Sequence, residues 1–118
     1  MNRIAFALTA VLSTAVCADQ YEELNKFFED NAVSAAYAQI CDEEPIAEAL
    51  KANTMMLLAV SGLKPHNVQL GSAKWGEVMR RQFIATKNTS SINCAQRVSE
   101  AKARLSETQH IIQATRRP

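Results

Sequence analysis

Residues that break helices are scarce in this chain. Its 118 residues include three glycines and three prolines, too few for a turn-dense β-sandwich, a collagen or a disordered Pro/Gly tract. Between these breakers, apolar residues recur at spacings of three and four, the period of an α-helix. The sequence therefore predicts an all-α fold, and its length allows one domain.

Two helices are expected in the first half of the chain. Residues 21–41 contain no Gly or Pro, and their apolar stripe consists of Tyr21, Leu24, Phe28, Ala32, Ala35 and Ala38, widened by Phe27, Val33 and Ile40. A second helix is expected to begin near Pro45, which suits a first helical turn, and to end at Ser61-Gly62. Its stripe consists of Ile46, Leu50, Asn53, Leu57 and Val60.

Two further helices are expected in the second half. Residues 65–67 read as a loop, and the third helix is expected to start between 67 and 73, with Gly71 and Gly76 weakening its first turns, and to end near Lys87. Its apolar face consists of Trp75, Val78, Met79, Phe83 and Ile84. Hydroxyls in residues 89–91 suit an N-cap for a fourth helix over 91–114, with a heptad-like seam of Cys94, Val98, Ala101, Leu105, Thr108 and Ile112.

The N-terminal residues have the pattern of an export signal. A basic start at Arg3 precedes an uncharged run from Ile4 to Val16, and small residues then precede Asp19. This pattern is typical of a secretory signal peptide, and the run is shorter than the roughly 20 residues of a membrane span. We expect residues 1–18 to be a cleaved signal peptide and 19–118 a single helical domain without a membrane segment. The protein would be periplasmic in a bacterium and extracellular otherwise.

Cys17 opens one alternative to cleavage after Ala18. Bacterial lipoproteins are cut before a lipidated cysteine, but their pattern has Gly, Ala or Ser just before that cysteine and usually Leu three residues before it. Val16 and Thr14 stand at those positions here. The sequence therefore favours cleavage after Ala18 over lipidation.

Cys41 and Cys94 are the cysteines that remain after cleavage. An even count in an exported chain favours a disulfide. Four helices joined by short loops tend to alternate in direction, which puts the end of the first helix and the start of the fourth at the same end of adjacent helices. We therefore expect a small antiparallel four-helix bundle with one Cys41–Cys94 disulfide, worth about 4 kcal/mol of stability in the chain-entropy model.

Charge is unevenly distributed along the mature chain. Residues 19–48 hold nine acidic residues and one lysine, whereas residues 49–118 hold three acidic and eleven basic residues. The acidic first part either packs beside the basic helices or forms a polarised surface that steers a charged partner. Scattered basic residues and an aromatic content of 6% argue against nucleic acid as that partner.

Motifs for catalysis or metal binding are missing from the sequence. It has no nucleophile elbow, P-loop, H-E-x-x-H, EF-hand or haem-attachment motif, so we expect neither an enzyme nor a bound metal or cofactor. The carboxylates of Asp42-Glu43-Glu44 suit a helix start. Glu107 and His110 share a helix face but read as a surface pair, and Asn88-Thr89-Ser90 is a glycosylation sequon that matters only in a eukaryotic host.

These exclusions favour a protein that acts by binding another protein, as a periplasmic adaptor, chaperone or secretion accessory. In size, helical content and single disulfide, the layout resembles that of secretion pilotins, which implies a secretion accessory; those proteins are usually lipidated. Alternatives are a binder of a small molecule or cofactor in the bundle interior, lined by Leu57, Trp75 and Phe83, and a secreted effector. The candidate partner-binding residues are Trp75, Met79, Met55, Met56, Arg80 and Arg81, because aromatic residues, Met and Arg are enriched in interfaces.

Overall fold

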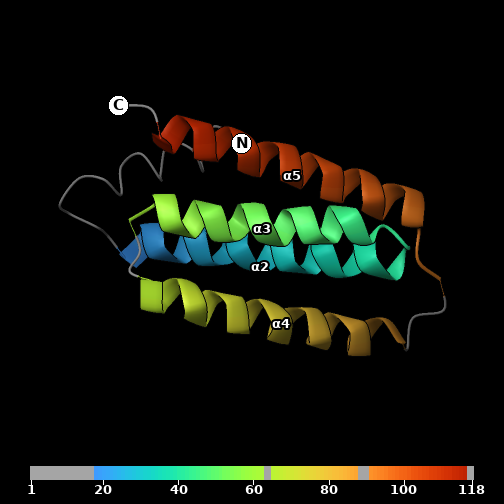
Figure 1. Ribbon diagram of the computed structural model, residues 1–118. Coiled ribbons are helices and arrows are strands. Elements are labelled where there is room, and N and C mark those ends of the chain that lie inside the picture. Colours follow the sequence, from blue (N-terminus) through green and yellow to red (C-terminus); the bar gives the residue numbers. More distant parts are fainter. Residues whose placement is uncertain (1–17, 63–64, 88–90, 117–118) are drawn as a thin grey trace.

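The described part of the chain is all-helical. A computed structural model describes residues 18–62, 65–87 and 91–116, which form four α-helices and no strand. The helices are α2 (Ala18–Ile40), α3 (Glu44–Val60), α4 (Pro65–Lys87) and α5 (Cys94–Arg116) (Figure 1). This confirms the predicted fold class. The signal-like segment up to Cys17 and the sequon at 88–90 lie outside the described residues.

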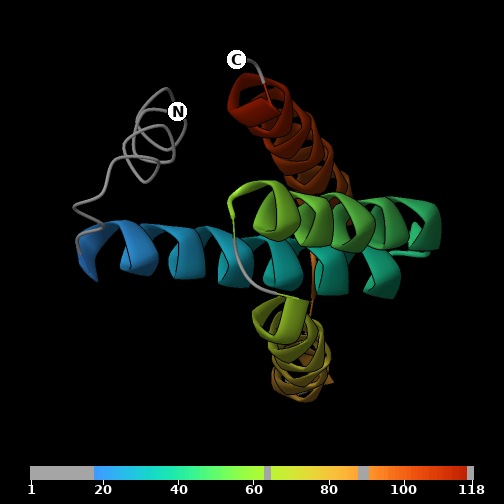
Figure 2. The same cartoon turned by 60° about the vertical axis from the view of Figure 1, so that its left-hand side comes forward.

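The helices are arranged around α2 and α3. Each of these two helices packs against the other and against both α4 and α5, whereas α4 and α5, as far as they are described, do not pack against each other. Figures 1 and 2 show α5 on one side of the central pair and α4 on the other. The predicted contact between the first and last helices is therefore present, but the described residues lack the α4–α5 contact that a closed ring of four helices in chain order would have.

Alanines explain how α2 packs against three helices. Ala32, Ala35, Ala36 and Ala38 are all fully buried, and their small side chains let neighbouring backbones approach on more than one face. Phe27 and Phe28 extend the same buried surface toward the N-terminus. The stripe predicted for this helix is thus confirmed over its described side chains.

Individual residue preferences explain the α2–α3 turn and much of the buried face of α3. Asp42 adopts a positive φ of 64°, and Pro45 lies in the first turn of α3. Leu50 and Leu57 are fully buried as predicted. Asn53 is only half-buried, and its Nδ2 donates to the carbonyl oxygen of Ala49 at 2.8 Å; the adjacent Thr54 is buried instead.

Helix α4 begins earlier than predicted. Pro65 starts the helix, so the loop expected at 65–67 is wrong; a proline at the first helical position lacks only an N–H that has no partner there. Gly71 lies inside the helix, and a Cβ built on it would come 2.9 Å from Cδ1 of Leu58 on α3. Ile84, predicted on the apolar face, is 51% exposed.

Helix α5 begins later than predicted. Its first residue is Cys94, and the backbone N–H of Gln96 donates to Oδ1 of Asn93 at 3.1 Å, so Asn93 caps the helix; the predicted capping residues 89 and 90 lie outside the described residues. From the predicted seam, Ala101, Thr108 and Ile112 are buried, and Ile111 is buried beside them.

The predicted disulfide is confirmed. Cys41 and Cys94 are bonded with a Cα–Cα distance of 5.6 Å and a sequence separation of 53 residues. The bond joins the residue after α2 to the first residue of α5. A loop of this length corresponds to about 4 kcal/mol in the chain-entropy model. Of the helices described, none is long and apolar enough to cross a membrane.

Candidate functional site

A surface hollow lies where α4 crosses the first turns of α3. We call it the α3–α4 groove. Its volume is about 220 Å³, and it is lined by Gln39, Glu44, Ala47, Glu48, Lys51, Trp75, Gly76 and Met79. The groove therefore brings together two of the predicted partner-binding residues, Trp75 and Met79.

Trp75 forms the inner wall of the α3–α4 groove. The side chain is 1% exposed, and its ring meets that of Phe28 edge to face, with centroids 5.5 Å apart. Its Nε1–H is buried and has no hydrogen-bond acceptor among the described residues. An unsatisfied buried donor costs about 1–3 kcal/mol, so an acceptor that reached this atom would bind favourably.

Met79 and Gly76 form the apolar floor of the groove. Met79 is half-buried and packs against the core cluster. A Cβ built on Gly76 would meet nothing within 4 Å, so the backbone of α4 is open to approach there. A flexible thioether beside an accessible helix backbone is suited to contact with another helix.

Acidic side chains outnumber basic ones on the α3 side of the groove, where Lys51 accompanies Glu44 and Glu48. Glu44 and Glu48 lie one turn apart and are exposed. The sequence suggested helix capping for the carboxylates of residues 42–44, but the N-cap residue Glu43 makes no side-chain capping hydrogen bond. The charges of Glu44 and Glu48 therefore remain at the surface, near the positive N-terminal end of the α3 dipole.

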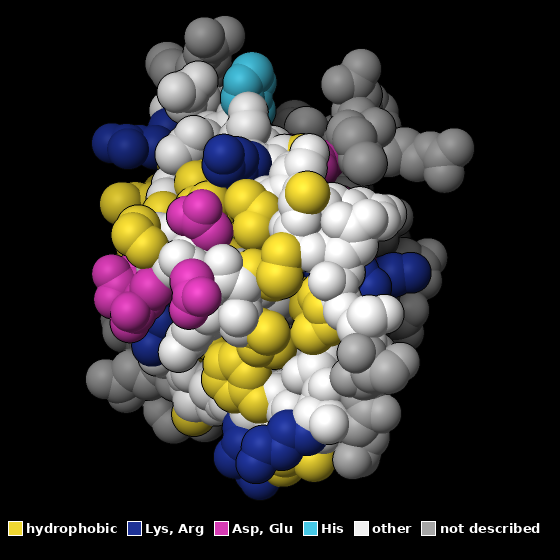
Figure 3. All heavy atoms as spheres, turned by 90° about the vertical axis from the view of Figure 1, so that its right-hand side faces the viewer, with side chains coloured by type: hydrophobic (Ala, Val, Ile, Leu, Met, Phe, Trp, Pro, Cys, Tyr) yellow, Lys and Arg dark blue, Asp and Glu magenta, His cyan; other side chains and the backbone are white. Residues whose placement is uncertain are grey.

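Basic side chains lie on α4. Arg80 and Arg81 are both exposed, and neither lines the groove itself. Successive residues of a helix are turned by about 100°. Arg80 therefore lies on nearly the same side of α4 as the groove residue Gly76, whereas Arg81 lies on the side opposite to Met79. Figure 3 views the molecule from the end at which α2 and α4 finish; hydrophobic side chains run down the middle, acidic side chains lie at the left, and basic side chains lie at the bottom and also around the other edges.

Met55 and Met56 lie outside the α3–α4 groove. Met55 is half-buried against the core cluster, and Met56 is 48% exposed. Neither residue lines the groove that contains Trp75 and Met79. The structure therefore divides the predicted partner-binding residues between two parts of the surface.

A buried polar network, which the sequence analysis missed, joins three helices. Nδ2 of Asn31 donates to Oγ1 of Thr54 and to Oγ1 of Thr108, both at 2.9 Å, and its Oδ1 accepts from Nε of Arg104 at 2.6 Å. Asn31, Thr54 and Thr108 are each at most 1% exposed. The guanidinium of Arg104 also lies over the Phe27 ring, 4.8 Å from its centroid.

A second hollow lies beside this network, between α2 and α5. Its volume is about 390 Å³, and it is lined by Asp30, Val33, Ser34, Glu100, Ala103, Arg104 and Glu107. Oε2 of Glu107 is buried without a hydrogen-bond partner among the described residues. His110, its predicted companion, is exposed and does not line this hollow.

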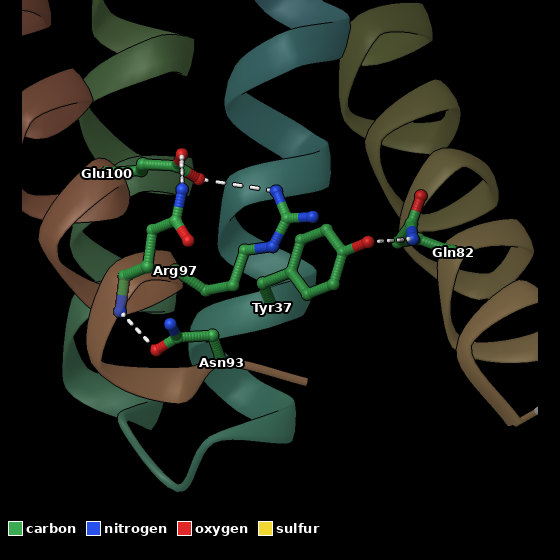
Figure 4. Close-up of polar contacts among 6 residues, drawn as sticks. Tyr37, Gln82, Asn93, Arg97 and Glu100 are labelled. Atoms are coloured by element: carbon green, nitrogen blue, oxygen red, sulfur yellow. Dashed lines mark hydrogen bonds and ion pairs between the residues drawn. The ribbon is translucent and has the colours of Figure 1, made fainter. Parts of the chain in front are cut away.

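Tyr37 bridges α4 and α5 near the disulfide (Figure 4). Nε2 of Gln82 on α4 donates to the Tyr37 hydroxyl at 3.0 Å, and the Arg97 guanidinium of α5 lies 4.1 Å from the centre of the tyrosine ring. Arg97 also pairs with Glu100 at 3.3 Å. One side chain of α2 therefore connects the two helices that do not pack together.

Comparisons give no independent indication of the site's role. Within residues 18–62, 65–87 and 91–116, no group of three or more His, Cys, Asp or Glu side chains is placed to hold a metal ion. No protein-family model matches the chain, and no curated protein or solved structure is significantly similar to it.

Proposed function

We propose that this is an exported protein that acts by protein–protein interaction, with the α3–α4 groove as its interaction surface. Export is proposed from the signal-like pattern of residues 1–18. The mature domain would be a small antiparallel helical bundle held by the Cys41–Cys94 disulfide, a bond typical of oxidising compartments.

The observation that most supports this proposal is that the groove combines apolar residues, a buried tryptophan and acidic side chains. Gly76 and Met79 line the groove together with Trp75, whose Nε1 is buried without a hydrogen-bond partner among the described residues, and the Glu44 and Glu48 carboxylates line one wall. Binding interfaces combine a dry apolar centre with a polar rim in this way. The alternative of a ligand in the bundle interior has less support, because Leu57 and Trp75 both pack in the core cluster.

Site-specific photo-crosslinking in the native host tests this proposal. A benzophenone amino acid replaces Lys51, which lines the groove, or Met56, which is exposed outside it, in the full chain with its signal segment. We expect protein adducts from position 51 and few from position 56, and a mature N-terminus at Asp19. Equal adduct formation at both positions, or none at either, would contradict the groove as the interaction surface.

A further inference from the structure

The second half of α4 presents an uncovered face. No residue from Met79 to Lys87 is buried, although Met79, Phe83 and Ile84 are large apolar residues. Met79 and Phe83 are half-buried and Ile84 is 51% exposed. This exposure follows from the fold, because α4 packs against α2 and α3 but not against α5.

Opposite charges border this uncovered face. The Glu44 and Glu48 carboxylates lie on the α3 side. Arg80 and Lys87 are exposed on α4 and lie seven residues apart, so both are on the same side of the helix, about two turns from each other.

We propose that the occupant of the α3–α4 groove is a second copy of this chain, related by a twofold axis that runs along the apolar residues Met79 and Phe83 of α4. This inference rests on the proposed function, in which the groove is an interaction surface, and names its partner. In such an isologous contact the same patch meets itself. Arg80 and Lys87 of each copy then face Glu44 and Glu48 of the other, so the same acidic–basic contact forms at two symmetric places in the interface.

Charge and backbone shape together favour a second copy as the partner. A surface with one acidic wall, one basic wall and an apolar centre is complementary to itself after a half-turn rotation. The open space above Gly76 lets the α4 helix of the second copy approach closely. Met79 and Phe83 of the two copies then bury each other, which supplies the apolar contribution to association.

Sedimentation equilibrium of the mature, oxidised protein tests this proposal through charge reversal. The Glu44→Lys, Glu48→Lys variant has two basic walls, and the Arg80→Glu, Lys87→Glu variant has two acidic walls. Each variant alone is expected to dissociate at least about tenfold more readily than the unmodified protein, because like charges then face each other. An equimolar mixture of the two is expected to regain a dimer, since every wall again meets its opposite.

A matched control separates this effect from net charge. Arg81 and Lys102 are exposed and lie outside the groove, so Arg81→Glu, Lys102→Glu changes the net charge by the same amount and is expected to leave the dimer intact. An unmodified protein that stays monomeric at all concentrations, or a mixture that fails to restore the dimer, would overturn the proposal.

The crosslinking experiment distinguishes the two proposals. An adduct from position 51 with the mass of two chains supports both of them. An adduct with a different protein, together with a monomeric chain in the centrifuge, overturns the second copy and supports the proposed function. No adduct from position 51 and a monomeric chain would refute both.

Discussion

Asn31 uses both the donors and the acceptor of its side chain in the interior of the protein. Its amide donates to Thr54 of α3 and Thr108 of α5 and accepts from Arg104. Each contact needs a particular axial position and rotation of the neighbouring helix. A satisfied polar group of this kind fixes how the helices are aligned, whereas apolar contacts tolerate small shifts.

Replacing Asn31 by alanine is expected to lower the free energy of unfolding by about 2–4 kcal/mol, because the Thr54 and Thr108 hydroxyls lose a partner and the Arg104 guanidinium loses an acceptor. Asn53→Ala is the matched control, since Nδ2 of Asn53 bonds only within its own helix, and it is expected to cost less than about 1 kcal/mol. Urea unfolding followed by circular dichroism measures both. Equal losses in the two variants would show that the network contributes nothing specific.

This network could not be predicted from the sequence. A stripe of apolar residues identifies the buried face of each helix, and it correctly placed Phe28, Leu50 and Leu57. It gives no reason to bury Asn31, whose partners Thr54 and Thr108 lie 23 and 77 residues away. On α3 it selected Asn53 over Thr54, because only the position of a partner decides which of two adjacent polar residues faces inward.

The position of α4 depends on a glycine at its contact with α3. A Cβ on Gly71 would come 2.9 Å from Cδ1 of Leu58 and 3.6 Å from Cε2 of Phe28, so the absence of a side chain lets α4 approach both α3 and α2. Leu58 is itself 5% exposed and has little room to move. The sequence showed a glycine that weakens a helix, while the fold uses it for close packing.

Substitution of two glycines of α4 by alanine tests this contact. Gly76→Ala is expected to raise the free energy of unfolding by about 0.5–1 kcal/mol, because alanine has the higher helix propensity and nothing lies within 4 Å. Gly71→Ala gains the same propensity but must displace Leu58, so its net effect is expected to be zero or destabilising. Thermal unfolding at one low protein concentration compares them; an equal gain at both positions would mean that the close approach is unimportant.

At the scale of the whole molecule, the disulfide and the fully buried hydrogen bonds between helices join α2, α3 and α5 or their ends. The alanines of α2 lie at the centre of the core. The disulfide pairing was predictable from the cysteine count and the expected alternation of helix direction. The separation of α4 from α5 was not, because helix spacing along the chain does not tell which pair of a four-helix set lies apart.

Hydrogen exchange is expected to reflect this unequal distribution. Backbone amides of Phe83–Lys87 lie in helix turns without a buried residue, so they should exchange much faster than those of Ala32–Ala38 in the middle of the core, because local opening there exposes little apolar surface. Mass spectrometry of dilute protein, in which a dimer would have dissociated, measures this difference. Similar protection in both segments would contradict the assigned packing.

The exposed turns of α4 from Met79 to Lys87 also affect how this protein can evolve. Substitutions between Met79 and Lys87 remove no buried side chain, so they carry a small penalty for folding compared with changes inside α2. Natural variation can therefore change the exposed surface of these turns while the rest of the scaffold stays the same. The same property makes this stretch the natural place to graft new binding specificities.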